Sequence, residues 1–92
     1  MRVVADEQRL LAAAHELRDM IVTRYPDAEI RLAYGTDPPG LYVLPTVDVE
    51  DTDEVFELVL ERLLTLQVDE ELPVYVFPER PLARILAESA EG

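Results

Sequence analysis

Residues 28–49 read AEIRLAYGTDPPGLYVLPTVDV, which is the clearest structural signal in the chain. Apolar and polar residues alternate on both sides of a break at Asp37-Pro38-Pro39-Gly40, as they do in half-buried strands. Proline and glycine at the break favour a tight turn. The stretch therefore predicts a β-hairpin, with one strand over 28–35 and the other over 41–49.

The second strand of this hairpin has two apolar faces. Leu41, Val43, Val47 and Val49 share one face, while Tyr42 and Leu44 lie on the other. Pro45 lacks a backbone donor, so we expect its strand to lie at an edge of the sheet or to contain a bulge there.

Segments on either side of the hairpin have helical periodicity. Between Asp6 and Tyr25, apolar residues recur every three or four positions, and Pro26 ends the pattern. A second helix follows the capping oxygens of 51–53 and runs to about Val68. Its apolar residues spread over half of the helical wheel, so we expect this helix to contact two partners.

The remaining elements complete an α-β-β-α-β-α order. Residues 72–77 form a third strand bounded by prolines, and Pro81 suits the first turn of a short last helix. A right-handed β-α-β crossover makes the third strand parallel to the second. The 92 residues predict one α+β domain, a two-layer sandwich with a three-stranded mixed sheet and helices mainly on one face.

The other face of the predicted sheet is apolar and has little to cover it. Only the short last helix remains for that role, and an exposed apolar patch usually marks an interaction site. We expect a homodimer. The two copies would pack through the sheet or through the spare arc of the second helix, which is the part of its wide apolar side that the sheet leaves uncovered. The alternative, in which the terminal segments fold back and close a monomer, stays open. The face comprises Ala33, Tyr42, Leu44, Tyr75 and Phe77.

Negative charge is concentrated in one part of the chain. Between Asp37 and Glu71 there are eleven carboxylates and one arginine, Arg62, within a formal net charge of −12. Such a field repels nucleic-acid phosphates and anionic membranes and attracts basic proteins. We therefore expect a basic protein partner, and neither direct nucleic-acid binding nor membrane association; surface acid that only maintains solubility is the alternative. The expected contributors are Asp48, Glu50, Asp51, Asp53, Glu54 and Glu57.

Residues that could carry catalysis are sparse. His15 is the only histidine, Ser89 is the only serine, and there is no cysteine. An activated site needs a nucleophile, a base and an orienting group together, so we predict no catalytic residue and no cofactor.

The acidic loop over 48–54 could form a binding site for a divalent metal ion, because hard cations prefer carboxylate ligands. The EF-hand frame fails, since Asp53 stands where glycine is needed. Helix capping explains the same acids, so we predict no metal ligand. The alternative is a small metal-dependent enzyme in which Asp48, Glu50 and Asp51 hold the ion.

One resemblance to a known family follows from the order of the elements. The first strand ends in Gly35-Thr36, and the chain then continues strand, helix, strand. This order resembles the minimal nucleotidyltransferase domain, whose first strand ends in Gly-Ser and whose metals are held by a closely spaced Asp-x-Asp pair. Residues 41–45 stand where that pair would be and contain no carboxylate. The resemblance therefore implies a degenerate nucleotidyltransferase-like domain without its catalytic acids.

The sequence also bears on compartment and source. Charge appears too early for a signal peptide, and no apolar run approaches the roughly 18 residues of a membrane span, so we expect a cytoplasmic protein. All eight basic residues are arginine, with no lysine or asparagine, which fits a GC-rich bacterial genome. Seven prolines and few amides fit a thermophilic source, whereas the absence of lysine argues against one.

Overall fold

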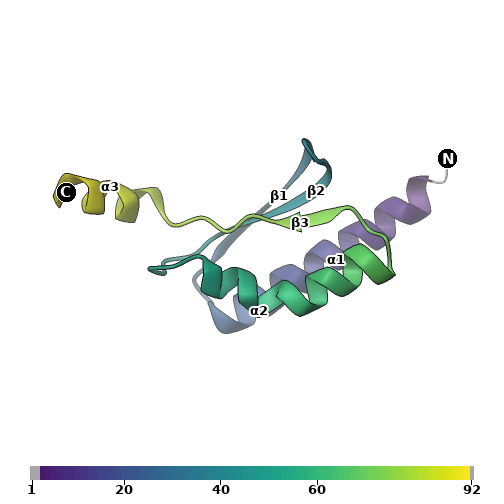
Figure 1. Cartoon of the computed structure of the whole chain (residues 1–92), viewed down its shortest axis with the longest axis horizontal. Coiled ribbons are helices and arrows are strands. Elements are labelled where there is room, and N and C mark those ends of the chain that lie inside the picture. Colours follow the sequence, from purple (N-terminus) through teal and green to yellow (C-terminus); the bar gives the residue numbers. More distant parts are fainter. Residues whose placement is uncertain (1–2, 92) are drawn as a thin grey trace.

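Residues 3–91, which the computed structural model describes, form the predicted order α-β-β-α-β-α (Figure 1). A π-helical turn, η1, extends the second helix. The elements are α1 (Val3–Arg24), β1 (Glu29–Thr36), β2 (Pro39–Thr46), α2 (Asp53–Leu64), η1 (Thr65–Asp69), β3 (Val74–Val76) and α3 (Leu82–Glu91).

The strands form one mixed sheet in the order β1-β2-β3. The hairpin strands are antiparallel, with Leu32 opposite Val43. β3 runs parallel to β2, with Val76 also opposite Val43. The chain from β2 to β3 passes through α2, which is the connection that parallel neighbours need. The predicted mixed sheet and its crossover are therefore confirmed.

The prediction for Pro45 is wrong, because β2 is the central strand and its register has no bulge. Pro45 is fully buried and pairs with Ile30 of β1. Its carbonyl accepts a hydrogen bond from the Glu79 N–H at 2.8 Å. Proline can occupy this central strand because β3 ends at Val76. The hydrogen bond that a backbone N–H at position 45 would donate toward β3 lies beyond the regular ladder between the two strands.

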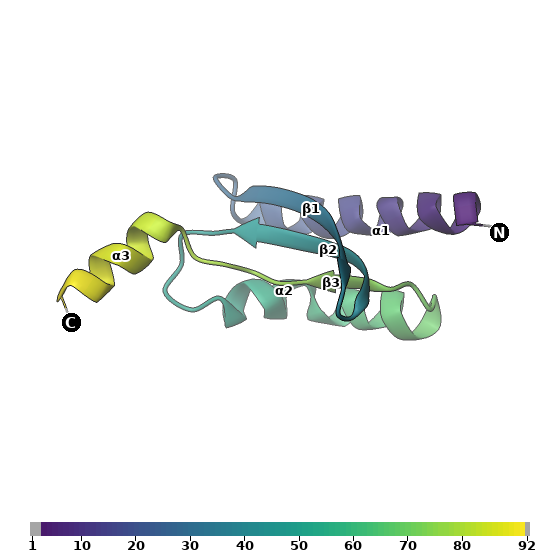
Figure 2. The same cartoon turned by 90° about the horizontal axis from the view of Figure 1, so that it is seen from above.

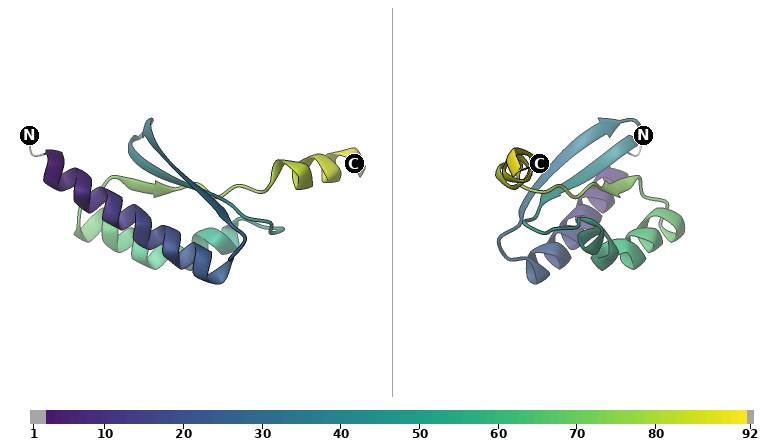
Figure 3. Two further views of the ribbon diagram at one scale, coloured as in Figure 1. Left: turned by 180° about the vertical axis from the view of Figure 1, so that it is seen from behind. Right: turned by 60° about the vertical axis from the view of Figure 1, so that its left-hand side comes forward.

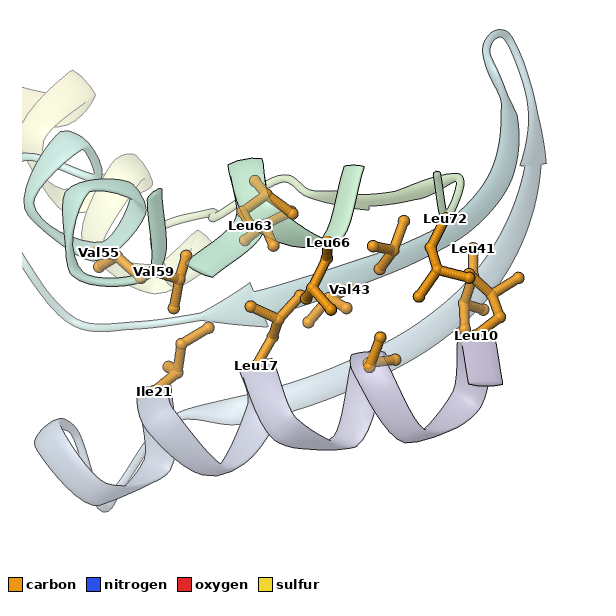
Figure 4. Close-up of a cluster of buried hydrophobic side chains, with 14 of the residues drawn as sticks. Leu10, Leu17, Ile21, Leu41, Val43, Val55, Val59, Leu63, Leu66 and Leu72 are labelled. Atoms are coloured by element: carbon orange, nitrogen blue, oxygen red, sulfur yellow. The ribbon is translucent and has the colours of Figure 1, made fainter. Parts of the chain in front are cut away.

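α1 and α2 lie side by side on one face of the sheet (Figure 2) and enclose the core with β2 and β3. Figure 4 shows Leu17 and Ile21 of α1 directed toward Val43 of β2 and Val59 of α2. Full burial of each such side chain stabilises the fold by about 1.5–3 kcal/mol. The buried apolar residues are Leu10, Ala13, Ala14, Leu17, Ile21, Leu41, Val43, Val47, Val49, Val55, Val59, Leu63, Leu66, Leu72, Val74 and Val76.

The ends of α2 agree only in part with the predicted capping. Asp51 caps the helix, because its Oδ1 accepts a hydrogen bond from the Asp53 N–H at 2.9 Å. Thr52 occupies the N-cap position but makes no side-chain capping bond. At the other end, the helical path continues to Asp69 as a wider π-helical turn that buries Leu66.

α3 extends away from the rest of the molecule (Figures 1 and 3). The chain measures 52 × 25 × 19 Å along its principal axes. Its radius of gyration is 14.4 Å, whereas a compact chain of this length would have about 12 Å. Within the described residues, no helix covers the face of the sheet opposite α1 and α2. The prediction of helices mainly on one face is therefore confirmed.

The packing predicts a large difference between two leucines of α1. Leu17→Ala should lower the free energy of unfolding by about 2–5 kcal/mol, because it removes a fully buried side chain and leaves a cavity. Leu11→Ala, at a position that is 37% exposed, should cost less than about 1 kcal/mol. Urea denaturation of both variants measures the difference, and equal losses would contradict the proposed core.

Candidate functional site

Three aromatic rings and a leucine occupy the uncovered side of the sheet. The Tyr42 ring packs edge-to-face against both Tyr75 and Phe77, with ring centroids 5.9 Å and 4.9 Å away. Tyr75 and Phe77 stack at 6.4 Å. We call Tyr42, Leu44, Tyr75 and Phe77 the aromatic face. These four residues were predicted to share one exposed side, and the structure places them together there.

The aromatic face is preorganised by contacts within the hairpin. The Tyr42 hydroxyl donates a hydrogen bond to the Pro38 carbonyl at 2.7 Å. Gly35 leaves room for the ring, since a Cβ there would lie 2.1 Å from Tyr42 Cζ. The rings shield one another, so Tyr42, Leu44 and Tyr75 are only partly exposed, while Phe77 is 42% exposed. This side is therefore less open than the sequence predicted, although no other element covers it in the described chain.

The apolar side of α3 is largely exposed, and two of its residues, Leu82 and Ile85, line a hollow with Thr46 and Pro78. Leu82, Ile85 and Leu86, at the i, i+3, i+4 spacing of one helical side, are 69%, 41% and 59% exposed. The opposite side carries Arg84 and Glu88. The short last helix was the one element available to cover the aromatic face, and the structure shows that it does not.

The polar side of α3 is attached to the loop after β2. Arg84 donates a hydrogen bond from Nη1 to Asp48 at 2.7 Å, and its Nη2 lies 3.7 Å from Glu50. Arg80 donates from Nε to the Val49 carbonyl at 3.0 Å and pairs with Glu88 through Nη2. Five charged side chains therefore hold the start of α3, which we call the root of α3, against the loop after β2.

These contacts shift the protonation equilibria of the groups involved. The pKa of Arg84 is raised, chiefly because Asp48 accepts its hydrogen bond. The pKa of Glu88 is lowered, first by the hydrogen bond from Arg80 and then by the charges of Arg80 and Arg84. Arg84 Nε is shielded from water and lies 3.4 Å from Glu88, although without hydrogen-bond geometry.

The predicted acidic rim is divided among three roles. Asp48 and Glu50 pair with Arg84 as described. Glu54 accepts a hydrogen bond from the Tyr25 hydroxyl at 2.8 Å. Burial, followed by this hydrogen bond, raises the pKa of Tyr25. The third role is the capping of α2 by Asp51.

Two predicted acids remain on the outer side of α2, and a third joins them. Asp53, Glu57 and Glu61 are exposed at a spacing of four residues, and we call them the acidic stripe. Within residues 3–91, none of the three has a basic side chain in ion-pair contact. Like charges four apart destabilise a helix by about 0.2–0.5 kcal/mol per pair. The stripe is therefore an uncompensated negative surface.

The residues considered for chemistry do not gather. His15 is exposed on α1. In the described part of the chain, no three His, Cys, Asp or Glu side chains come together as a possible metal site. Asp48 and Glu50, which the metal alternative needs, already have the guanidinium of Arg84 as their counter-charge. Leu41 and Val43, where a nucleotidyltransferase would place carboxylates, lie in the core.

Sequence reasoning missed two features of these surfaces. Glu61 was not included with the acids of α2, although its spacing of four from Glu57 was a visible signal. The pairing of Arg84 with Asp48 was not foreseen, because the two residues are 36 positions apart.

Comparisons of the chain with protein-family models, with curated proteins and with solved structures found no match. Among residues 3–91, no helix has both the length and the apolar character that crossing a membrane requires. The surfaces described above therefore provide the basis for inferring function.

The root of α3 should respond to acid in a defined way. Because the folded pKa of Glu88 is lowered, its contribution is complete above the ordinary glutamate value of 4.5 and is lost as pH falls through the lowered value. Arg80→Gln should move the titration midpoint of Glu88 upward, as measured by carboxyl-carbon NMR. Arg18→Gln, which removes a pair with the adjacent Asp19, is the control and should leave that midpoint unchanged.

Proposed function

We propose that this protein is a non-catalytic interaction domain that acts as a homodimer and docks a basic protein partner. The observation that carries the docking proposal is the acidic stripe, Asp53, Glu57 and Glu61, exposed along one side of α2 without counter-charge among the described residues. A basic partner would relieve the repulsion within the stripe and would be steered toward it by the long-range field.

The charge distribution favours a basic protein over other charged partners. The net charge of −12 repels nucleic-acid phosphates and anionic lipids. The acids nearest to α3 are already paired with arginine, so the acidic stripe is the surface with the most to gain from a cation. Attraction to exposed charges is screened over about 8 Å at physiological salt. Binding through the stripe should therefore weaken steeply as salt is added.

A cytoplasmic location and a bacterial, heat-adapted source belong to the same proposal. The location rests on the early charge and the lack of a long apolar run, the bacterial source on the arginine-only basic composition, and heat adaptation on the seven prolines and few amides. The proposal does not depend on them, because stripe and partner would interact in the same way in any aqueous compartment.

Charge reversal of the acidic stripe tests the docking proposal. The protein should copurify with a basic protein from its native host at low salt, and the triple variant Asp53→Lys, Glu57→Lys, Glu61→Lys should lose that partner. Quantitative mass spectrometry of the two samples measures the change, for which we expect a loss of at least tenfold. Recovery of no basic protein by the unmodified chain would contradict the proposal.

A second triple variant controls for net charge. Asp27→Lys, Glu29→Lys and Asp37→Lys make the same change in charge at exposed positions outside α2. This variant should retain the partner if the stripe is the binding surface. An equal loss in both variants would mean that binding follows total charge and not this surface.

Metal addition separates the proposal from the enzyme alternative. A ligand that binds only the folded state must raise the melting temperature. Because Asp48 and Glu50 already have the guanidinium of Arg84 beside them, millimolar Mg²⁺, Ca²⁺ or Mn²⁺ should leave the melting temperature unchanged. A rise with one of these ions that is abolished by Asp48→Asn and Glu50→Gln would favour the metal-dependent alternative.

A further inference from the structure

We propose that the dimer forms by exchange of α3, whose apolar side lies on the aromatic face of a second copy while the second copy returns the same contact. The inference rests on the dimer in the proposed function and is independent of the basic partner. It assigns a role to the apolar side of α3, Leu82, Ile85 and Leu86, and to the aromatic face.

The orientation of α3 is the first argument. An amphipathic helix at the surface of a monomer normally turns its apolar side toward the core. Here the polar side faces the body through Arg84 and Asp48, and the three large apolar side chains remain 41–69% exposed. Because ion pairs at the root hold this orientation, the apolar side is presented to another molecule.

The position of α3 is the second argument. Within one copy, α3 projects along the long axis of the molecule, beyond the end of the sheet, and packs on neither face (Figure 3). The aromatic face lies over β2 and β3. Each chain thus supplies one uncovered apolar helix side and one uncovered apolar sheet side that do not meet. In two copies related by a twofold axis, the α3 of each copy covers the aromatic face of the other, so that all four apolar surfaces are covered.

The charge distribution indicates a second copy as the occupant. Two copies of a chain with charge −12 repel one another unless they meet where acid is sparse. Residues 80–92 contain two arginines and two glutamates and are neutral overall. The aromatic face has no charged residue of its own, and beside it on the same side of the sheet lie one exposed cation, Arg31 opposite Leu44, and two exposed acids, Glu29 and Glu79, which both pair with Thr46. A basic protein would find little counter-charge here and would favour the acidic stripe.

The dimensions of the two surfaces match. α3 has ten residues and is therefore about 15 Å long. The axes of the outer strands in a three-stranded sheet lie about 10 Å apart, so one such helix can cross the sheet. The exchanged arrangement buries four apolar surfaces.

Sedimentation equilibrium of the full chain tests the proposal. The unmodified protein should have twice the 10.4 kDa chain mass. The double variant Leu82→Glu, Leu86→Glu should have the mass of one chain, because charge on α3 cannot be buried against the rings. The control Leu64→Glu, at a leucine of α2 that is 49% exposed, should stay dimeric. If Leu64→Glu breaks the dimer and the α3 variant does not, the spare arc of α2 is the interface and the proposal is overturned.

Mixing two variants shows which surfaces meet. Phe77→Glu alters the most exposed ring of the aromatic face and should be monomeric alone, with circular dichroism confirming that it is folded. The Phe77→Glu chain keeps an unmodified α3, and the double α3 variant keeps an unmodified aromatic face. An equimolar mixture of the two therefore restores one intact contact between these two surfaces. The mixture should therefore contain heterodimers. If dimers pair through α3 against α3, no heterodimer forms and the proposal is overturned.

The outcomes separate this inference from the proposed function. A monomeric unmodified chain would overturn the dimer and α3 exchange together, while docking on the acidic stripe would still be tested by copurification. A dimer that survives both the α3 and Phe77 variants would overturn α3 exchange alone.

Discussion

The fold depends on the burial of β2 between two neighbouring strands and two helices. Leu41 and Val43 of this strand are almost completely buried under α1 and α2, and β2 is hydrogen-bonded on both sides. Its other face carries Tyr42, the ring that contacts both Tyr75 and Phe77. Because successive side chains point to opposite faces of a strand, the segment that organises the core also builds the aromatic face. Core stability and the shape of that surface are therefore coupled.

A second constraint comes from the ion pairs at the root of α3. Arg84 donates a hydrogen bond to Asp48 and lies 3.7 Å from Glu50, so the acids nearest to the helix already have a cation of the same chain beside them. The same contacts decide which side of α3 faces water. The acidic stripe has no such contact and remains an exposed negative surface, while Leu82 and Leu86 remain an exposed apolar one. The two proposed interactions consequently use separate parts of the molecule.

Much of the fold could be predicted from local pattern. The helical spacing of α1, the alternation in the hairpin and the turn at Asp37-Pro38 each reflect backbone geometry over a few residues, and the structure confirms them. The place of Pro45 could not be predicted in this way, because a central or edge position depends on where β3 ends. The candidate site was predicted less completely. The aromatic residues share a face as expected, but four acids of the predicted rim have three different roles, and the other two, Asp53 and Glu57, belong to the acidic stripe.

The sequence by itself determined the order of the elements, the apolar side of each and the location of the negative charge, because periodicity and composition are local properties. Only the tertiary structure decided which surfaces remain uncovered. The pattern of 82–88 identifies the apolar side of α3 but not what that side touches, since its direction depends on a contact between Arg84 and Asp48, 36 residues apart. Likewise, which acids remain without a counter-charge depends on arginines and tyrosines that are distant in sequence and that folding brings beside them.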